Sequence, residues 1–204
     1  MTTLVEVVSD FVCPWCFIGK RRLDRALAGS ARREDYTVRW LPYELDPSMS
    51  AAGRERLSYR THRFGSLEGS MQKDQQATLA GQDVGIAFRY DLIKRVPNTS
   101  NAHRLVWWAG THGEQRDAVE AILGAYFLEG RDIGSKQTLL EIAEDLQLPR
   151  AEIAAIFDDD RSLAEVRKLE HRVTSYGVAT VPSYILNRAE LVTQSLDSLI
   201  SIIH

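Results

Sequence analysis

The sequence predicts a mixed α/β chain in which a small sheet with helices on both faces is interrupted by a large block of helices. Three observations support this prediction: a strand–helix–strand pattern over residues 4–42, helical periodicity alone over residues 51–176, and a return of strand character over residues 182–193. With 204 residues, the chain is long enough for one well-packed domain or for a domain with a large insertion.

The first strand and helix are predicted by hydrophobic patterning. Residues 4–8 (Leu-Val-Glu-Val-Val) are apolar and rich in β-branched side chains, which is typical of a buried strand. Beyond Cys16, apolar residues recur at helical spacing until Gly29, a residue that favours a helix end. Because proline is favoured at the first helical position, Pro14 places Cys13 at the N-cap and Cys16 within the first turn.

The remaining elements follow the same reasoning. Residues 36–42 read as a second strand, and a right-handed crossover makes it parallel to the first. Helical periodicity then predicts helices over residues 51–63, 67–83, 100–112, 114–128, 135–146, 149–157 and 159–176. Residues 182–186 and 190–193 are predicted to be short strands, and residues 196–203 a closing amphipathic helix.

Cys13-Pro14-Trp15-Cys16 is the motif that indicates a chemistry, because these are the two cysteines of the chain. At a helix N-terminus, unpaired N–H groups and the positive end of the helix dipole favour a thiolate at Cys13. The sequence therefore predicts a redox dithiol, with Cys13 as the exposed nucleophile and Cys16 as the more buried resolving thiol. Pro14 and Trp15 are expected to tune its reduction potential.

Two other interpretations of the cysteine pair are weaker. A closed zinc site needs four ligands, and the sequence has no second cysteine pair and no histidine pair at zinc-finger spacing, so we predict no metal. A structural disulfide across two intervening residues would close a very small loop and would remove little entropy from the unfolded chain.

Composition and charge exclude several classes of function. The formal net charge is −3, so we expect no general attraction to nucleic acid. No apolar run approaches the roughly 20 residues that span a bilayer, so we expect no membrane insertion. The N-terminus shows no basic region followed by an apolar stretch, so the expected location is cytoplasmic. In that compartment a Cys-x-x-Cys motif is more often catalytic than structural.

The chain resembles a known family along nearly its whole length. Residues 9–20 (Ser-Asp-Phe-Val-Cys-Pro-Trp-Cys-Phe-Ile-Gly-Lys) resemble the opening of the FrnE-like proteins, which are DsbA-family thioredoxin-like oxidoreductases. Residues 98–105, 125–127 and 177–182 agree with it. The resemblance implies a thioredoxin fold with a large all-helical insertion, as in DsbA. The expected boundaries are 1–48 and 160–204 for the thioredoxin-like domain, and 49–159 for the insertion.

The resemblance also implies roles for residues outside the motif. Val181-Pro182 should form a cis peptide bond against the dithiol, and the Val181 backbone should pair with an extended substrate segment. The family's buried acidic residue near the end of the first strand is replaced here by Val7. Glu6 should point to the opposite sheet face, so Glu6, Asp10 or water is left to assist proton transfer to the resolving cysteine.

One wall of the family's substrate groove comes from the helical insertion. The start of the helix predicted at residue 100 supplies candidates for this wall in Asn98, Thr99 and His103. His103 would stabilise a thiolate or bind a substrate carboxylate. The alternative is that these residues only cap the helix and that His103 is a half-buried core residue.

These observations favour a protein-disulfide or dithiol oxidoreductase that carries a redox-active disulfide and no other bound cofactor. Its substrate would be a disulfide-containing protein or a small thiol, with glutathione as a candidate, and its state a monomer or homodimer. An alternative is a glutathione-binding transferase or isomerase of the kappa or 2-hydroxychromene-2-carboxylate isomerase type, although these usually have serine in place of Cys13. A chaperone or partner-binding module is a third interpretation.

Overall fold

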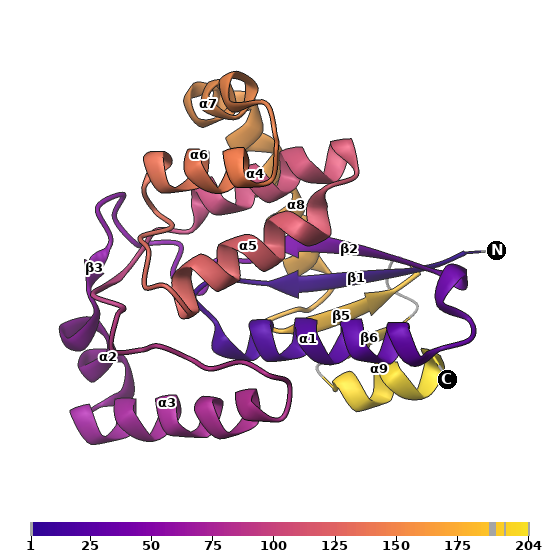
Figure 1. The fold of residues 1–204 in the computed structure, drawn as a ribbon, viewed down its shortest axis with the longest axis horizontal. Helices are drawn as coiled ribbons and strands as arrows, with labels where there is room; N and C mark the ends of the chain where they lie inside the picture. The colour runs from indigo at the N-terminus through magenta and orange to yellow at the C-terminus, as the bar shows by residue number, and fades with distance from the viewer. Residues whose placement is uncertain (1, 188–190, 194, 204) are drawn as a thin grey trace.

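The computed structural model describes residues 2–187, 191–193 and 195–203, and its centre is a four-stranded mixed sheet (Figure 1). The strand order is β2-β1-β5-β6. The strands are β1 (Thr3–Ser9), β2 (Tyr36–Pro42), β5 (Ser183–Leu186) and β6 (Leu191–Thr193). β1 runs parallel to β2, with Val5 opposite Val38, and antiparallel to β5, with Val7 opposite Tyr184. β5 and β6 are antiparallel.

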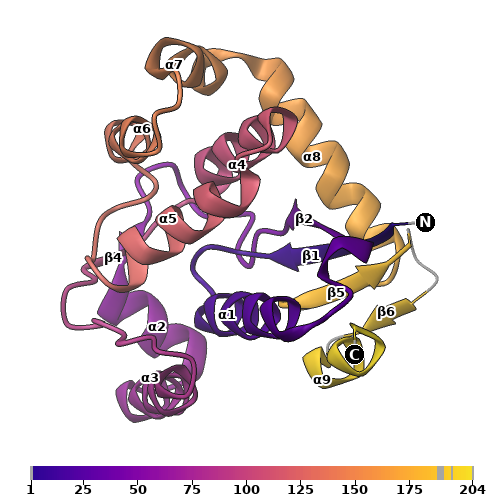
Figure 2. The same cartoon turned by 45° about the vertical axis from the view of Figure 1, so that its right-hand side comes forward.

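Helices cover both faces of this sheet (Figure 2). α1 (Pro14–Gly29) and α9 (Leu196–Ile203) pack together on one face, and α8 (Asp160–Ser175) lies on the other. A 3-10 turn at Arg33–Asp35 leads from α1 into β2. The side chains of β1 alternate between the faces, as strand geometry requires: Val5 and Val7 belong to the main core, whereas Glu6 bonds to α8.

The large insertion lies between β2 and α8 and is helical, as the sequence predicts. Two of its helices form a hairpin beside the start of α1, and the other four stack above the sheet (Figure 1). They are α2 (Arg56–Phe64), α3 (Leu67–Gln82), α4 (Ser100–His112), α5 (Gln115–Phe127), α6 (Lys136–Asp145) and α7 (Arg150–Asp158). Since α1 contacts both α3 and α5, its N-terminus faces the insertion. The thioredoxin fold with a helical insertion is thereby confirmed, while the exact division of the chain into domains stays a prediction.

One predicted helix is wrong at its start. The helix expected over residues 51–63 begins only at Arg56, because Glu55 is its N-cap and its carboxylate accepts hydrogen bonds from the backbone N–H groups of Leu57 and Ser58 at 2.7 and 2.6 Å. Before the cap, Gly53 has a φ of +65°, which ends any helix there. β3 (Arg54–Glu55) pairs with β4 (Arg95–Val96), a short ribbon that the sequence pattern does not predict.

The other boundaries differ from the predictions by a few residues at most. The strand expected from residue 182 begins at Ser183, after the cis peptide bond. The strand expected over 190–193 is described over Leu191–Thr193, and residue 190 lies outside the described residues. None of the described helices is both long enough and apolar enough to cross a membrane.

Candidate active site

The dithiol motif sits where β1 passes into α1, as predicted. Cys13 is the N-cap of α1 with extended backbone angles (φ −97°, ψ 109°), and Pro14 occupies the first helical turn. The Cys13 N–H donates to the Asp10 carbonyl (3.3 Å), and the Cys16 N–H donates to the Cys13 carbonyl (3.1 Å). The Cys13 side chain is therefore presented beside the free N–H groups and the positive end of the helix dipole.

The two thiols are free but differ in their surroundings. Both are buried, with exposed fractions of 5% for Cys13 and 3% for Cys16, so the prediction of an exposed Cys13 is wrong: the cis-proline loop and the insertion cover it. Burial raises the pKa of the Cys16 thiol well above its ordinary value, and the hydrogen bond to Cys13 and the charge of Cys13 raise that pKa further.

A cis-proline loop lies against the nucleophile position. The Val181–Pro182 peptide bond is cis, as the family resemblance implies, and the Cys13 thiol donates to the Val181 carbonyl at 3.7 Å. The loop is held by Ser183, whose hydroxyl donates to the Thr180 carbonyl at 2.7 Å. Val181 is buried at 8% exposure, so its side chain belongs to the core while its carbonyl faces Cys13.

Gly19 lets α1 approach this loop closely. A Cβ at Gly19 would lie 2.5 Å from the Tyr184 hydroxyl and 3.5 Å from Cγ of Pro182. Tyr184 is 1% exposed, and its hydroxyl has no hydrogen-bond partner among the described residues. The absence of a side chain at Gly19 therefore sets the distance between the helix that carries the dithiol and the strand that follows the cis-proline.

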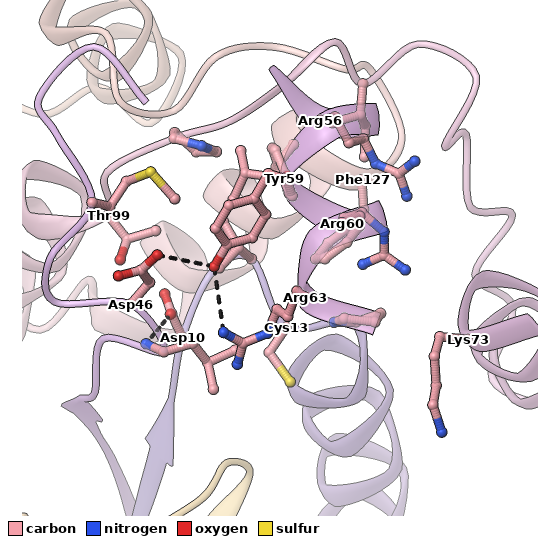
Figure 3. Close-up of a pocket in the computed structure, with 18 of the residues that line it drawn as sticks. Asp10, Cys13, Asp46, Arg56, Tyr59, Arg60, Arg63, Lys73, Thr99 and Phe127 are labelled. Carbon is pink, nitrogen blue, oxygen red and sulfur yellow. Dashed lines mark hydrogen bonds between the residues drawn. The ribbon is translucent and has the colours of Figure 1, made fainter. Parts of the chain in front are cut away.

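A pocket of about 320 Å³ opens beside Cys13 (Figure 3). Trp15 is 42% exposed at this pocket, so its ring is available to a bound substrate. Apolar side chains from the loops and helices of the insertion provide much of the lining, among them Met49, Phe64, Ile93, Tyr126 and Phe127. The arrangement can hold a molecule of small size with one of its sulfur atoms against Cys13.

The opposite wall of the pocket is basic, and this was not predicted. It is formed by Arg56, Arg60 and Arg63 of α2 together with Lys73 of α3 (Figure 3). The signal in the sequence is the spacing of the three arginines at i, i+4 and i+7, which places them on one helix face. Such a face is ordinarily a solvated surface, and only the tertiary contacts of α2 turn it toward Cys13.

A buried acid and a buried histidine lie together behind the pocket. The Asp10 carboxylate accepts a hydrogen bond from the Leu45 N–H through Oδ2 (2.7 Å), while Oδ1 is 3.6 Å from Nε2 of His103. Both side chains are at most 2% exposed, and neither Oδ1 nor Nε2 has a hydrogen-bond partner among the described residues. His103 also packs on the Phe11 ring, with centroids 4.8 Å apart.

The structure separates the three residues that were predicted for the groove wall. Thr99 lines the pocket. Asn98 is used to hold the backbone, because its amide donates to the Met49 carbonyl (2.8 Å) and its oxygen accepts from the Ser100 N–H (2.9 Å). His103 lies outside the pocket lining and contacts Asp10 instead.

The position of the family's acidic residue is apolar here. Val7 is in the main core, and Glu6 on the other face pairs with Arg172 of α8, with Oε1 and Nη2 2.7 Å apart. Asp10 is therefore the acidic residue whose charge acts on Cys16, and that charge raises the Cys16 pKa. Within the described ranges, no three His, Cys, Asp or Glu side chains converge as metal ligands would.

The fold and the N-capping dithiol define a thioredoxin-type protein. The model of the DSBA-like thioredoxin domain family matches residues 4–204, and the chain belongs to this family. Membership in the FrnE-like subgroup stays a prediction.

Individual relatives agree with this assignment. Protein YwbO of Bacillus subtilis (strain 168) is 26% identical over 188 residues, which cover 91% of this chain and 88% of the relative. A probable DsbA oxidoreductase from Streptomyces coelicolor is 26% identical with a TM-score of 0.89, over 98% of this chain and 88% of that one. The cytosolic disulfide reductase DsbM from Pseudomonas aeruginosa shares the fold at 20% identity, with a TM-score of 0.70 over 98% and 96% of the two chains.

Proposed function

We propose that this protein is a dithiol–disulfide oxidoreductase in which Cys13 is the nucleophile and Cys16 the resolving thiol. The observation that carries this proposal is the asymmetry of the pair. Both lie in one buried cluster, but Cys13 is the N-cap residue of α1 and lines the pocket, while Cys16 does not line it and has a pKa raised by burial. A pair that differs in this way separates the attacking sulfur from the sulfur that waits to release the product.

The reaction begins when the Cys13 thiolate attacks one sulfur of a substrate disulfide. The substrate S–S bond breaks, one half leaves as a thiolate, and the other half remains bound to Cys13 as a mixed disulfide. Cys16 then loses its proton and attacks the Cys13 sulfur, which releases the second half. The enzyme ends with a Cys13–Cys16 disulfide, and the substrate has gained two electrons. The reverse sequence oxidises a dithiol.

The resolving step needs an acceptor for the Cys16 proton. Asp10 is suited to this because it is buried beside His103 and because one of its carboxylate oxygens has no hydrogen-bond partner among the described residues. Its backbone N–H also lowers the pKa of Cys16 and so opposes part of the effect of burial. Asp10 would therefore serve as the proton acceptor, a role that an acidic residue at the position of Val7 has elsewhere in this family.

The cis-proline loop would bind the substrate backbone. The Val181 carbonyl already accepts from the Cys13 thiol, so a peptide or peptide-like substrate that pairs with Val181 would bring its sulfur to Cys13. Trp15, at the edge of the same pocket, offers an exposed aromatic surface to the substrate. We place this activity in the cytoplasm, where a low-molecular-weight thiol or dithiol would regenerate the reduced enzyme.

The experiment is to trap the mixed disulfide. Reduced Cys16→Ser protein is incubated with hydroxyethyl disulfide, and intact-protein mass spectrometry measures the adduct. We expect one hydroxyethylthio group on Cys13, none on Cys13→Ser protein, and an internal disulfide instead of an adduct in the wild-type chain. Adduct formation at equal rates on Cys13 and Cys16 in the two single variants would contradict the assigned roles.

Glutathione-dependent conjugation or isomerisation is the second candidate, favoured by a nucleophile that borders a basic pocket of small-molecule size. In that case Cys16 would be dispensable for activity, and the hydroxyl of a Cys13→Ser variant would be able to do the work of the Cys13 thiol. Glutathione turnover that survives in Cys13→Ser protein would select this candidate, whereas its loss supports the redox chemistry.

A further inference from the structure

The basic wall of the pocket is not explained by the thiol chemistry. Its four cations come from α2 and α3, and they line the same cavity as Cys13. The chain as a whole carries a formal charge of −3. The net negative charge of the chain therefore does not explain why four cations line the pocket of the nucleophile.

Two of the four cations share one carboxylate. Asp74 of α3 accepts from Nη2 of Arg56 (2.6 Å) and from Nη2 of Arg60 (2.5 Å), and all three side chains are about 85% buried. Arg60 also donates to the hydroxyl and the carbonyl of Ser70. These bonds fix α2 against α3. Because one carboxylate serves two guanidinium groups, even this structural pair leaves an excess of positive charge.

The other two cations are exposed at the edge of the pocket. Arg63 donates to the Tyr59 hydroxyl at 3.4 Å, a neutral partner, at the end of the pocket where Cys13 is drawn in Figure 3. Among the described residues, no carboxylate lies within ion-pair distance of Arg63 or Lys73. Both side chains are exposed, so an incoming anion can reach them.

The acids of the pocket do not neutralise these two cations. Asp46 accepts from the Ser48 hydroxyl (2.6 Å) and from the Tyr59 hydroxyl (3.1 Å). The Ser48 bond lowers the pKa of Asp46, which keeps that carboxylate charged. Asp10 is buried against Leu45 and His103. Both acids lie across the pocket from Lys73, on the side toward which the Arg63 guanidinium is drawn (Figure 3), and neither forms an ion pair with Arg63 or Lys73.

We infer that this pocket selects small disulfides that carry carboxylates, with the exposed cations Arg63 and Lys73, which lie on either side of Cys13 in Figure 3, attracting the carboxylates while Cys13 attacks the sulfur. This inference rests on the proposed function and deepens it. The cavity volume of about 320 Å³ is at the lower end of the range for small-molecule sites, and Cys13 is only 5% exposed within it. A small anion reaches the sulfur more readily than the disulfide of a folded protein does.

The chemistry balances without a further oxidant. One disulfide bond of the substrate breaks, two substrate thiols form, and the two electrons come from Cys13 and Cys16 as they join in a disulfide. The two protons that the substrate thiols gain correspond to those that the cysteine pair gives up. A dithiol such as dithiothreitol returns the enzyme to its reduced form.

The test is a charge series of small symmetric disulfides. Dithiodipropionate carries carboxylates, hydroxyethyl disulfide is neutral and cystamine carries ammonium groups. The rate of oxidation of the reduced enzyme is followed by intrinsic tryptophan fluorescence in single turnovers, to which Trp15 in the dithiol motif contributes. Each rate is divided by the rate of free dithiothreitol with the same disulfide, which removes differences in intrinsic reactivity. We expect the corrected rate to be highest for dithiodipropionate and lowest for cystamine.

The variant that tests the wall is Arg63→Gln combined with Lys73→Gln. We expect its corrected rate with dithiodipropionate to fall about 3- to 10-fold, since solvent-exposed ion contacts are weak, while the rate with hydroxyethyl disulfide stays within about 2-fold. Arg161→Gln with Lys168→Gln is the matched control, because these exposed cations lie on α8. The control should leave every rate unchanged.

The possible outcomes separate the two proposals. If wild-type enzyme reacts with all three disulfides at equal corrected rates, or if the control pair lowers the anion rate as much as the pocket pair, the charge inference is overturned while the redox function stands. If the enzyme reacts with none of the three, the proposed function itself fails. A preference for the anion that disappears only in the pocket variant supports both.

Discussion

The close approach of α1 to the cis-proline strand depends on Gly19, and Gly19→Ala tests it. The new Cβ would lie 2.5 Å from the Tyr184 hydroxyl, which is closer than real Cβ contacts allow. Tyr184 has little freedom to retreat, because it is 1% exposed and lies on β5 between Val7 and Thr193. The substitution must therefore displace either the ring or the helix that carries the dithiol.

The magnitude follows from two opposing effects. Alanine in place of glycine inside a helix stabilises by about 1 kcal/mol, whereas overpacking a core costs about 1–3 kcal/mol. Gly124→Ala in α5 is the matched control, since its Cβ would meet no atom within 4 Å. The two variants should therefore differ by about 1–3 kcal/mol in the free energy of unfolding, or by about 2–12 °C in Tm for a chain of this length.

The Tyr184→Phe substitution supplies a rescue. Besides the hydroxyl oxygen, the nearest atoms to the new Cβ are Pro182 atoms at 3.5 and 3.7 Å, so no atom of the Tyr184 ring would come closer than an ordinary contact. Gly19→Ala combined with Tyr184→Phe should regain the stability that Gly19→Ala loses. Urea unfolding of the reduced proteins measures the free energy of unfolding of Gly19→Ala, Gly124→Ala, Tyr184→Phe and the double variant. The reasoning is refuted if Gly19→Ala alone is as stable as Gly124→Ala.

Three further predictions concern charged and titrating groups. Arg172→Met leaves the Glu6 carboxylate buried without its partner (side-chain exposure 1%) and should cost about 3 kcal/mol in urea unfolding, a loss that Glu6→Gln in the same chain should reduce. In reduced Cys13→Ser protein, burial alone should keep the Cys16 pKa raised, so thiolate absorbance at 240 nm should appear only above about pH 9. The unfolded chain releases the same proton near the ordinary pKa of a thiol. The stability that the buried thiol contributes is therefore present below pH 9 and is lost as pH rises through the folded pKa. A rise centred near pH 8 would contradict this. Asp10→Asn retains an acceptor for the Leu45 N–H but should slow release of the mixed disulfide by about 10²-fold in stopped-flow measurements, and an unchanged rate would remove Asp10 from the proton path.

The parts of the site that could be predicted from the sequence are local. Pro14 after Cys13 determines where α1 begins, and period-two alternation in β1 places Glu6 and Val7 on opposite faces. The cis geometry at Val181–Pro182 was implied only by the family resemblance, since the residues alone do not distinguish it from an ordinary strand start.

The parts that could not be predicted depend on contacts between distant segments. From the sequence, the basic face of α2 is expected to be solvated surface. In the structure α2 packs against α3, and this face lines a pocket with the start of α1. His103 looked like a groove residue because its helix starts near the site, yet its ring turns to Asp10. The hydrogen bond of Asn98 to the Met49 carbonyl likewise joins two loops whose spacing the sequence does not specify.

The central claim is that Cys13 and Cys16 form a reversible redox pair. The most direct measurement is an equilibrium titration of the purified protein across dithiothreitol and glutathione ratios, with intrinsic tryptophan fluorescence and free-thiol content followed in parallel. We predict one reversible two-electron transition in which both signals coincide. A midpoint near about −270 mV would make the protein a reductant, and one near about −120 mV an oxidant. If no disulfide forms at any ratio, the assignment of an oxidoreductase is contradicted.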